Sequence, residues 1–317
     1  MSDDLSNTSR GSASDQALAA FVHAYMDDRR RERRWRWITR GIWIGLLVLF
    51  VWSAVSERRA GMAVTEPHTA LVDIQGEIGA DQEANADSIM ASLRDAFEAK
   101  SAQAVVLRIN SPGGSPVQAG LINDEIRRLK KLHHKKIYAV CEEMCASAAY
   151  YIAVATDQIF VDKASIVGSI GVLMDGFGFT GTMEKLGVER RLLTSGRNKG
   201  MLDPFSPMSD QQRAYAQTML DQIHEQFIAA VRAGRGARLK ENADTFSGLF
   251  WTGQQAVQMG LADHLGSLDE VARDVVKAED VVDYTQKENV AEKLAKKLGA
   301  SIADEMLHTA SIWPHLR

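Results

Sequence analysis

From residue 69 onward, short apolar runs alternate with longer segments in which apolar residues recur every three or four positions. The short runs predict buried strands, and the longer segments predict amphipathic helices. Repeated strand–helix units favour an α/β fold with a largely parallel sheet, whose functional sites lie at the carboxyl ends of the strands. The predicted strands cover residues 69–74, 104–109, 137–141 and 158–161, and the predicted helices cover residues 87–100, 117–129 and 209–231.

The longest predicted helix, residues 209–231, carries its own start signal. Ser209 followed by Gln212 has the spacing of a capping box. Its predicted core face includes Tyr215 and Phe227.

A different pattern precedes this region, because residues 37–55 form a nearly continuous apolar run. A helix of that length spans roughly 28 Å, close to the ~30 Å hydrocarbon core of a membrane. Trp37 and Trp52 lie near its two ends, where interfacial aromatic residues are enriched. Because no small-residue cleavage site follows the run, we expect an uncleaved membrane anchor.

Charge fixes the expected orientation of this anchor. Residues 29–40 hold seven arginines and one glutamate, whereas only Arg58 and Arg59 follow the run closely. The positive-inside rule therefore predicts a single-pass protein with a cytoplasmic N-terminus and a main body outside the cytoplasm. The expected location is the inner (cell) membrane, with the main body periplasmic or otherwise extracytoplasmic. The predicted domains are a cytoplasmic tail at 1–36, the transmembrane anchor at 37–56, a linker at 57–68, the main domain at 69–284, and a C-terminal helix and tail at 285–317.

The rest of the composition narrows the chemistry. Residues 29–40 carry a net charge of +6 while the whole chain carries −4, so the remainder is acidic and no nucleic-acid partner is expected. No HExxH, CxxC or P-loop pattern occurs, so the sequence indicates no metal and no cofactor. Cys141 and Cys145 are either a disulfide in an oxidising compartment or two free buried thiols.

Ser147 is the candidate nucleophile, because it stands between the predicted strand at 137–141 and an apolar segment with helical spacing. A hydroxyl at such a turn lies near a helix N-terminus, where free N–H groups favour negative charge. The alternative is that Ser147 simply caps this helix. Gly113 and Gly114, after another predicted strand, can turn backbone N–H groups toward a developing oxyanion.

A serine nucleophile needs a base, and the sequence leaves several candidates. The GxSxG and SxxK patterns of other serine hydrolases are absent. His264 and the pair His133–His134 are possible bases, and Lys199 stands out in a glycine-flanked loop. Lowering a lysine pKa from ~10.4 to ~7 requires about 4.6 kcal/mol, which burial supplies. Ser169, in a glycine-flanked apolar turn, is a candidate for orienting the amine, although it is equally well explained as an ordinary turn serine.

Four motifs in this order resemble the signal peptide peptidase A family of serine proteases. They span roughly residues 68–275 and consist of Asn110–Gly114, Ala146–Ala153, Val167–Gly171, and Trp251–Ala256 with Gly260–Asp263. Many relatives have glycines after the nucleophile, where this chain has Ala148 and Ala149.

The resemblance implies a ClpP/crotonase-like fold and a Ser–Lys dyad. On that pattern Ser147 is the nucleophile, Lys199 the general base and Ser169 the hydroxyl that positions the amine, with oxyanion donors near Gly114 and Ser147. It further implies a membrane-anchored homo-oligomer, an octamer in the short form, that degrades apolar signal peptides after their release.

Three alternatives remain open at this stage. One is a protease of the same family that trims membrane proteins instead of signal peptides. The second is a crotonase-like acyl-thioester enzyme, since that fold shares the oxyanion site. The third is a non-catalytic membrane scaffold with a degenerate site.

Overall fold

The computed structural model describes residue 35, residues 37–46, residue 48 and residues 65–286. The chain divides into two units, Met1–Val64 and Thr65–Arg317. In the first unit, the described residues are helical and their side chains are exposed. No helix among the described residues is both long enough and apolar enough to span a membrane.

Several sequence predictions fall on parts of the chain that the structure does not describe. The second half of the predicted anchor, most of the predicted tail and linker, and residues 287–317 of the predicted C-terminal helix lie outside the described residues. Residues 285 and 286 belong to no helix or strand.

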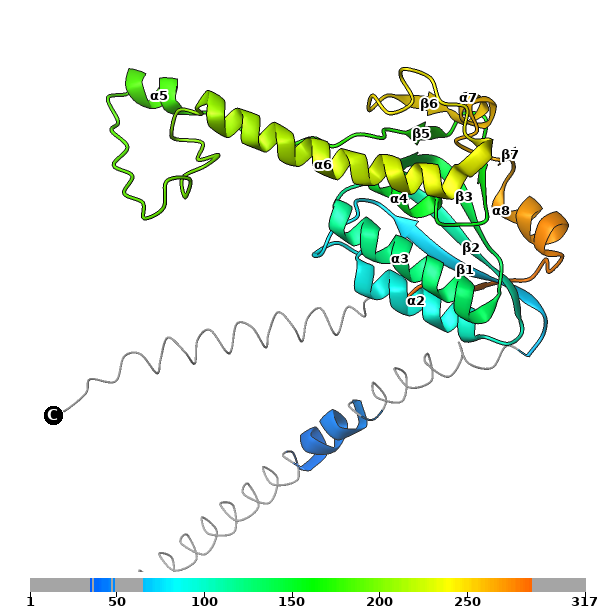
Figure 1. The fold of residues 1–317 in the computed structure, drawn as a ribbon. Helices are drawn as coiled ribbons and strands as arrows, with labels where there is room; N and C mark the ends of the chain where they lie inside the picture. Colours follow the sequence, from blue (N-terminus) through cyan, green and yellow to red (C-terminus); the bar gives the residue numbers. More distant parts are fainter. Residues whose placement is uncertain (1–34, 36, 47, 49–64, 287–317) are drawn as a thin grey trace, which may run out of the picture. The chain divides into compact units, whose positions relative to one another are not determined.

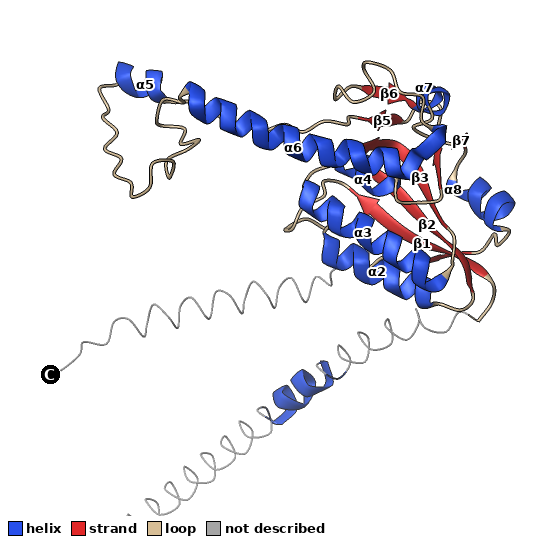
Figure 2. Ribbon diagram, in the orientation of Figure 1, coloured by secondary structure: helices blue, strands red, loops and turns tan. Residues whose placement is uncertain are grey.

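The second unit is built on a largely parallel sheet, as the strand–helix alternation predicts (Figures 1 and 2). The strand order is β6-β5-β3-β2-β1-β8, with β4 pairing β3 and β7, and the pair β5–β6 is antiparallel. The strands are β1 (His68–Gln75), β2 (Ala102–Ser111), β3 (Ile137–Ala146), β4 (Gln158–Val161), β5 (Ile166–Gly168), β6 (Phe250–Thr252), β7 (His264–Leu265) and β8 (Val281–Asp283). The helices are α2 (Ala86–Glu98), α3 (Pro116–His133), α4 (Ala148–Ala153), α5 (Thr180–Lys185), α6 (Asp210–Arg235), η1 (Gly236–Arg238), α7 (Gly253–Met259), α8 (Leu268–Glu270) and η2 (Val271–Val276).

Alternate residues of the central strands face two separate cores. Val105 and Leu107 of β2 belong to the large core, which also includes residues of α2, α3 and α4. Val106 points to the other face and joins a smaller cluster with Val271 of η2. Successive side chains of a strand point to opposite faces of the sheet, and here both faces are covered. The interior strands therefore consist of continuous apolar runs.

The predicted capping box of α6 is confirmed. The Ser209 side chain accepts a hydrogen bond from the Gln212 backbone, and the Gln212 side chain accepts one from the Ser209 backbone. The helix continues beyond the predicted end to Arg235, where Gly236 adopts a positive φ of 53°.

The outer half of α6 does not pack as predicted. Tyr215, assigned to the core face, is 63% exposed, whereas Phe227 further along the helix is buried. The outer end of α6 and residues 172–209, which we call the arm, project away from the sheet (Figure 1). The predicted core face of α6 is therefore correct only where the helix crosses the main domain.

Candidate active site

Ser147 occupies the turn where β3 gives way to α4. Its backbone has φ 55° and ψ −124°, a region that non-glycine residues rarely adopt and that costs about 1–3 kcal/mol. The turn is held by a hydrogen bond from the Ser147 N–H to the Gly168 carbonyl at 2.8 Å, and the Ser147 carbonyl accepts the Tyr151 N–H at 3.0 Å. Backbone strain of this kind is typical of functional turns.

The Ser147 side chain does not cap the helix that follows it. Ser147 stands at the N-cap position of α4, but its hydroxyl makes no capping hydrogen bond. The simpler interpretation of this residue, a serine retained for its capping side chain, is therefore wrong. The half-buried hydroxyl is left available for other chemistry.

Gly113 and Gly114 follow β2 and lie against the Ser147 turn. A Cβ atom on Gly113 would lie 2.7 Å from the Ser147 Cβ and 2.9 Å from the Ala148 nitrogen. A Cβ on Gly114 would lie 2.1 Å from the Ile78 carbonyl oxygen. Both glycines have positive φ, 107° and 143°. Only glycine fits this close approach of three backbone segments.

The hydrogen bonds distinguish the two glycines. The Gly113 N–H donates to the Ser111 hydroxyl at 3.1 Å, so it is already engaged. Within residues 65–286, the N–H groups of Gly114 and Ala148 donate to no protein acceptor. These two free donors flank the Ser147 turn, which is the arrangement that stabilises an oxyanion.

Ser169 lies beside the nucleophile turn, because Gly168 pairs with Ala146 across β3 and β5. Its φ is 50°, and its N–H donates to the Leu249 carbonyl at 2.8 Å. The structure thus brings together four sequence-predicted residues, namely Ser147, Ser169, Gly113 and Gly114.

Lys199 is not part of this group within one chain. It belongs to the segment of the arm between α5 and α6, and its side chain is exposed. Figure 1 shows this segment at the end of α6 remote from the sheet. Its backbone N–H donates to the Gly196 carbonyl at 3.1 Å. Within the second unit, Lys199 therefore lies in the arm, whereas Ser147 lies at the turn between β3 and α4.

The histidine candidates lie elsewhere. The ring of His264 on β7 packs against Phe160, which belongs to the smaller core on the other face of the sheet. His133 ends α3 and His134 caps it, at the opposite end of that helix from Gly114. Neither position serves Ser147.

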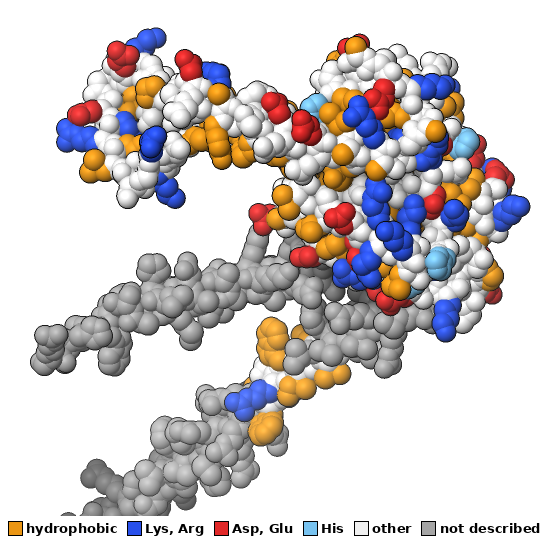
Figure 3. All heavy atoms as spheres, in the orientation of Figure 1, with side chains coloured by type: hydrophobic (Ala, Val, Ile, Leu, Met, Phe, Trp, Pro, Cys, Tyr) orange, Lys and Arg blue, Asp and Glu red, His pale blue; other side chains and the backbone are white. Residues whose placement is uncertain are grey.

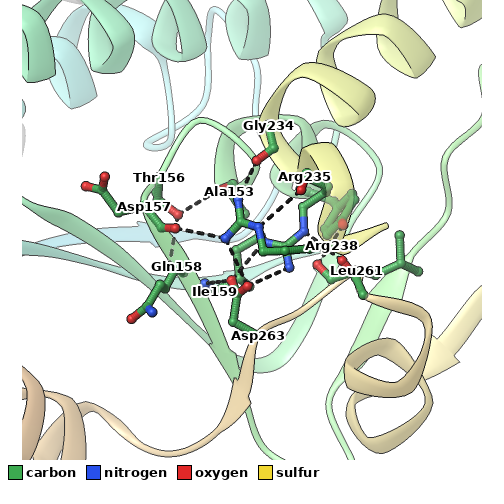
Figure 4. A network of polar contacts seen from close by, with 12 residues as sticks. Ala153, Thr156, Asp157, Gln158, Ile159, Gly234, Arg235, Arg238, Leu261 and Asp263 are labelled. Atoms are coloured by element: carbon green, nitrogen blue, oxygen red, sulfur yellow. Dashed lines mark hydrogen bonds and ion pairs between the residues drawn. The ribbon is translucent and has the colours of Figure 1, made fainter. Parts of the chain in front are cut away.

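Asp263, adjacent to His264, has a structural partner that sequence reasoning missed (Figure 4). Arg235 at the end of α6 donates to both carboxylate oxygens of Asp263 at 2.8 and 2.9 Å, and Arg238 adds a third contact at 2.9 Å. The carboxylate also accepts the Ile159 N–H at 2.7 Å. Burial by itself raises the pKa of Asp263, but the hydrogen bonds and charge of Arg235 outweigh it and hold the pKa below the ordinary value.

The two cysteines are free thiols, buried on β3. Burial and the contact with Cys141 raise the pKa of the Cys145 thiol. A buried protonated thiol is inert. Among the described residues, no cluster of three or more histidine, cysteine, aspartate or glutamate side chains is placed to hold a metal ion.

Replacing Gly113 with alanine is expected to reduce turnover at the Ser147 site by about 10²–10³-fold, the range seen when an oxyanion donor is displaced. The new methyl group would collide with Ser147 and push the Ala148 N–H out of place. Gly120 on α3 is the matched control, because a Cβ there meets no atom within 4 Å. Gly120→Ala should leave turnover unchanged, and equal kcat/KM for the two variants would contradict the prediction.

Comparison with known proteins gives this site a family context. Residues 130–282 match the model of peptidase family S49. A putative signal peptide peptidase SppA of Enterococcus faecium is 30% identical over 201 residues, which cover 63% of this chain and 58% of that protein. Protease 4 of Haemophilus influenzae is 33% identical over 221 residues, covering 68% of this chain and 35% of that protein.

A further match carries a different name. A protein of Brucella abortus named Na(+)/H(+) antiporter NhaA is 46% identical over 181 residues, which cover 57% of this chain and 25% of that protein. This chain thus spans about a quarter of that relative's length. The match to the protease model confirms the resemblance drawn from the four sequence motifs.

Proposed function

We propose that this chain, whose residues 130–282 match the model of peptidase family S49, is a membrane-anchored serine endopeptidase of that family with Ser147 as its nucleophile. The observation that carries the proposal is the strained Ser147 turn, whose hydroxyl makes no capping hydrogen bond and against which Gly113 packs. The N–H groups of Ala148 and Gly114, the residues that follow Ser147 and Gly113, donate to no protein acceptor within residues 65–286. This arrangement occurs at the carboxyl ends of parallel strands, where α/β proteins place their sites.

The proposed reaction is acyl transfer through a covalent intermediate. The Ser147 oxygen attacks the peptide carbonyl carbon while a neutral lysine amine accepts the hydroxyl proton. The N–H groups of Gly114 and Ala148 stabilise the resulting oxyanion, each at about 2.7–4 kcal/mol. The protonated amine then gives its proton to the leaving nitrogen, and water hydrolyses the acyl-enzyme by the same steps.

Lys199 is the proposed base, and its place on the arm suggests how it reaches the serine. In a single chain the lysine is exposed and remote from Ser147, whereas a lysine acts as a base only when burial favours its neutral form. Docking of the arm on a neighbouring copy would bury the lysine beside that copy's Ser147 and Ser169. The proposed active unit is therefore a homo-oligomer, for which the family resemblance suggests an octamer.

The proposed substrates are apolar peptides, with released signal peptides as the first candidates and membrane-protein segments as the alternative. The arm exposes many large apolar side chains in the segments on either side of α5, and Figure 3 shows hydrophobic side chains on the arm and beneath the outer part of α6. They include Leu173, Phe177, Phe179, Leu186, Val188, Leu193 and Phe205. An exposed apolar surface of this kind marks a binding region for peptides or for other copies of the chain.

The location is proposed from the sequence. The apolar run at 37–56 would anchor the chain in the inner membrane, with the arginine-rich residues 1–36 in the cytoplasm and the protease domain at 69–284 outside it.

Labelling with a serine-reactive phosphonate tests the proposal. Incubation of the full chain in detergent with a diaryl phosphonate carrying a leucine side chain should modify Ser147, as read by mass spectrometry. Cleavage of a leucine-rich fluorogenic peptide should fall in proportion to labelling. A folded oligomer that neither reacts nor cleaves would instead support the non-catalytic scaffold.

A further inference from the structure

His224 of α6 contacts the turn that carries Ser169. Its ring Nε2 lies 3.0 Å from the carbonyl oxygen of Ile170, in a half-buried setting. A carbonyl oxygen only accepts hydrogen bonds, so Nε2 must carry the proton in this contact. That donor is present both in the Nε2–H tautomer and in the fully protonated ring, so the bond does not depend on the charge of His224.

The turn held by His224 is closely tied to the nucleophile. Ile170 directly follows Ser169, and the Gly171 N–H closes the turn on the Ser169 carbonyl at 3.0 Å. On the other side, the Ser169 N–H donates to Leu249 and the Gly168 carbonyl accepts the Ser147 N–H, both at 2.8 Å. The Ser169 backbone, at φ 50°, is thus fixed by Leu249 on one flank and by His224 on the other.

His224 also lies on the face of α6 that packs on the main domain. His224, Phe227 and Val231 share a helix face by their spacing, and the Phe227 ring lies 5.1 Å from that of Tyr151 in α4. Beyond this region α6 continues toward the arm, where Tyr215 is 63% exposed. His224 therefore connects α6 with the turn that carries Ser169, and the other end of α6 leads into the arm that carries Lys199.

We infer that His224 is a positioning residue, which sets the Ser169 hydroxyl for the lysine amine through its hydrogen bond to Ile170. This inference rests on the proposed function. Without the bond, the Ser169 turn loses one of its two flanking supports and the hydroxyl is held less well. An error of about 1 Å in such a group costs up to 10²-fold in rate.

Substitution of His224 with leucine and with glutamine tests this role. Glutamine can place an amide N–H near the position of Nε2, whereas leucine fills similar space without a donor. We expect His224→Leu to lower kcat about tenfold or more, with KM within about twofold, and to move the acid limb of the kcat–pH profile to higher pH. His224→Gln should restore most of the lost kcat. Gln226→Leu is the matched control, because Gln226 is an exposed residue of the same helix and its replacement should change neither quantity.

A double-mutant cycle separates positioning from simple stabilisation. If His224 acts through Ser169, then His224→Leu should have almost no further effect on kcat in a Ser169→Ala background. Additive losses would overturn the inference, as would equal kcat for the leucine and glutamine variants. If His224→Leu cleaves peptide as well as the wild type does, this inference alone is overturned. If the wild type itself cleaves no peptide, the proposed function is overturned as well.

Discussion

Ser147→Ala and Lys199→Ala are each expected to abolish peptide cleavage, whereas the two variants produced together in one cell are expected to regain part of the activity. Loss of a serine nucleophile or its base costs on the order of 10⁶ in kcat, because neither group acts without the other. The recovery follows from geometry. Lys199 lies on the exposed arm, remote from the Ser147 turn of the same chain.

The size of the recovery distinguishes two arrangements of the dyad. If each site takes its serine from one copy and its lysine from the next, random mixing leaves about a quarter of the sites with both groups intact. If both groups come from one chain, no site is intact. Co-expression with two affinity tags, sequential purification of mixed oligomers and measurement of kcat give the answer.

The control for this experiment is Lys185→Ala, which removes another exposed lysine at the end of α5. It should retain full activity alone and in mixtures. Mixed oligomers without activity, formed from variants that each assemble normally, would contradict a dyad shared between copies.

The central sheet was predictable from sequence because its strands are covered on both faces. A continuous apolar run such as residues 104–109 buries all its side chains only in a sheet that is covered on both faces. The extension of β3 through Glu142 and Glu143 to Ala146 was not predictable from apolar content. These residues belong to the strand because its backbone passes from pairing with β4 to pairing with β5, a long-range feature.

The site was predictable in proportion to how local its signals are. Ser147, Gly113 and Gly114 lie at turns between a strand and a helix, and the residues adjacent to them in sequence are enough to predict those turns. The exposure of Tyr215 was missed because helical periodicity reports an amphipathic face without saying how far the domain beneath it extends. His224 was missed for a similar reason, since its partner Ile170 is 54 positions away. Arg235 and Asp263 are also far apart in sequence, at 28 positions, so their pairing was missed as well.

Replacing Arg235 with methionine is expected to lower the free energy of unfolding by about 3 kcal/mol, toward the lower end of the ~3–5 kcal/mol range for breaking a buried ion pair. Arg235 and Asp263 are 2% and 8% exposed, so the carboxylate would lose a bidentate partner without gaining water. The lower end applies because Arg238 still reaches Asp263 at 2.9 Å. Urea unfolding at neutral pH measures the change. Arg232→Met removes an exposed arginine paired with Glu241, and as a control it should cost less than about 1 kcal/mol.

The pH dependence of this loss identifies the unpaired carboxylate as its cause. In the wild type, the pKa of Asp263 is held below its ordinary value because Arg235 outweighs the effect of burial. The stability from the pair is therefore complete above the unfolded-state pKa, and it is lost as the pH falls through the folded-state pKa. In Arg235→Met, burial favours the protonated acid, so the difference in the free energy of unfolding from wild type should narrow as the pH falls.

The double variant with Arg235→Met and Asp263→Asn should recover most of the lost stability at neutral pH, because asparagine keeps an acceptor for the Ile159 N–H. A difference that stays constant with pH, and a double variant no more stable than the single one, would show that the arginine stabilises the domain through packing and its bond to Gly260.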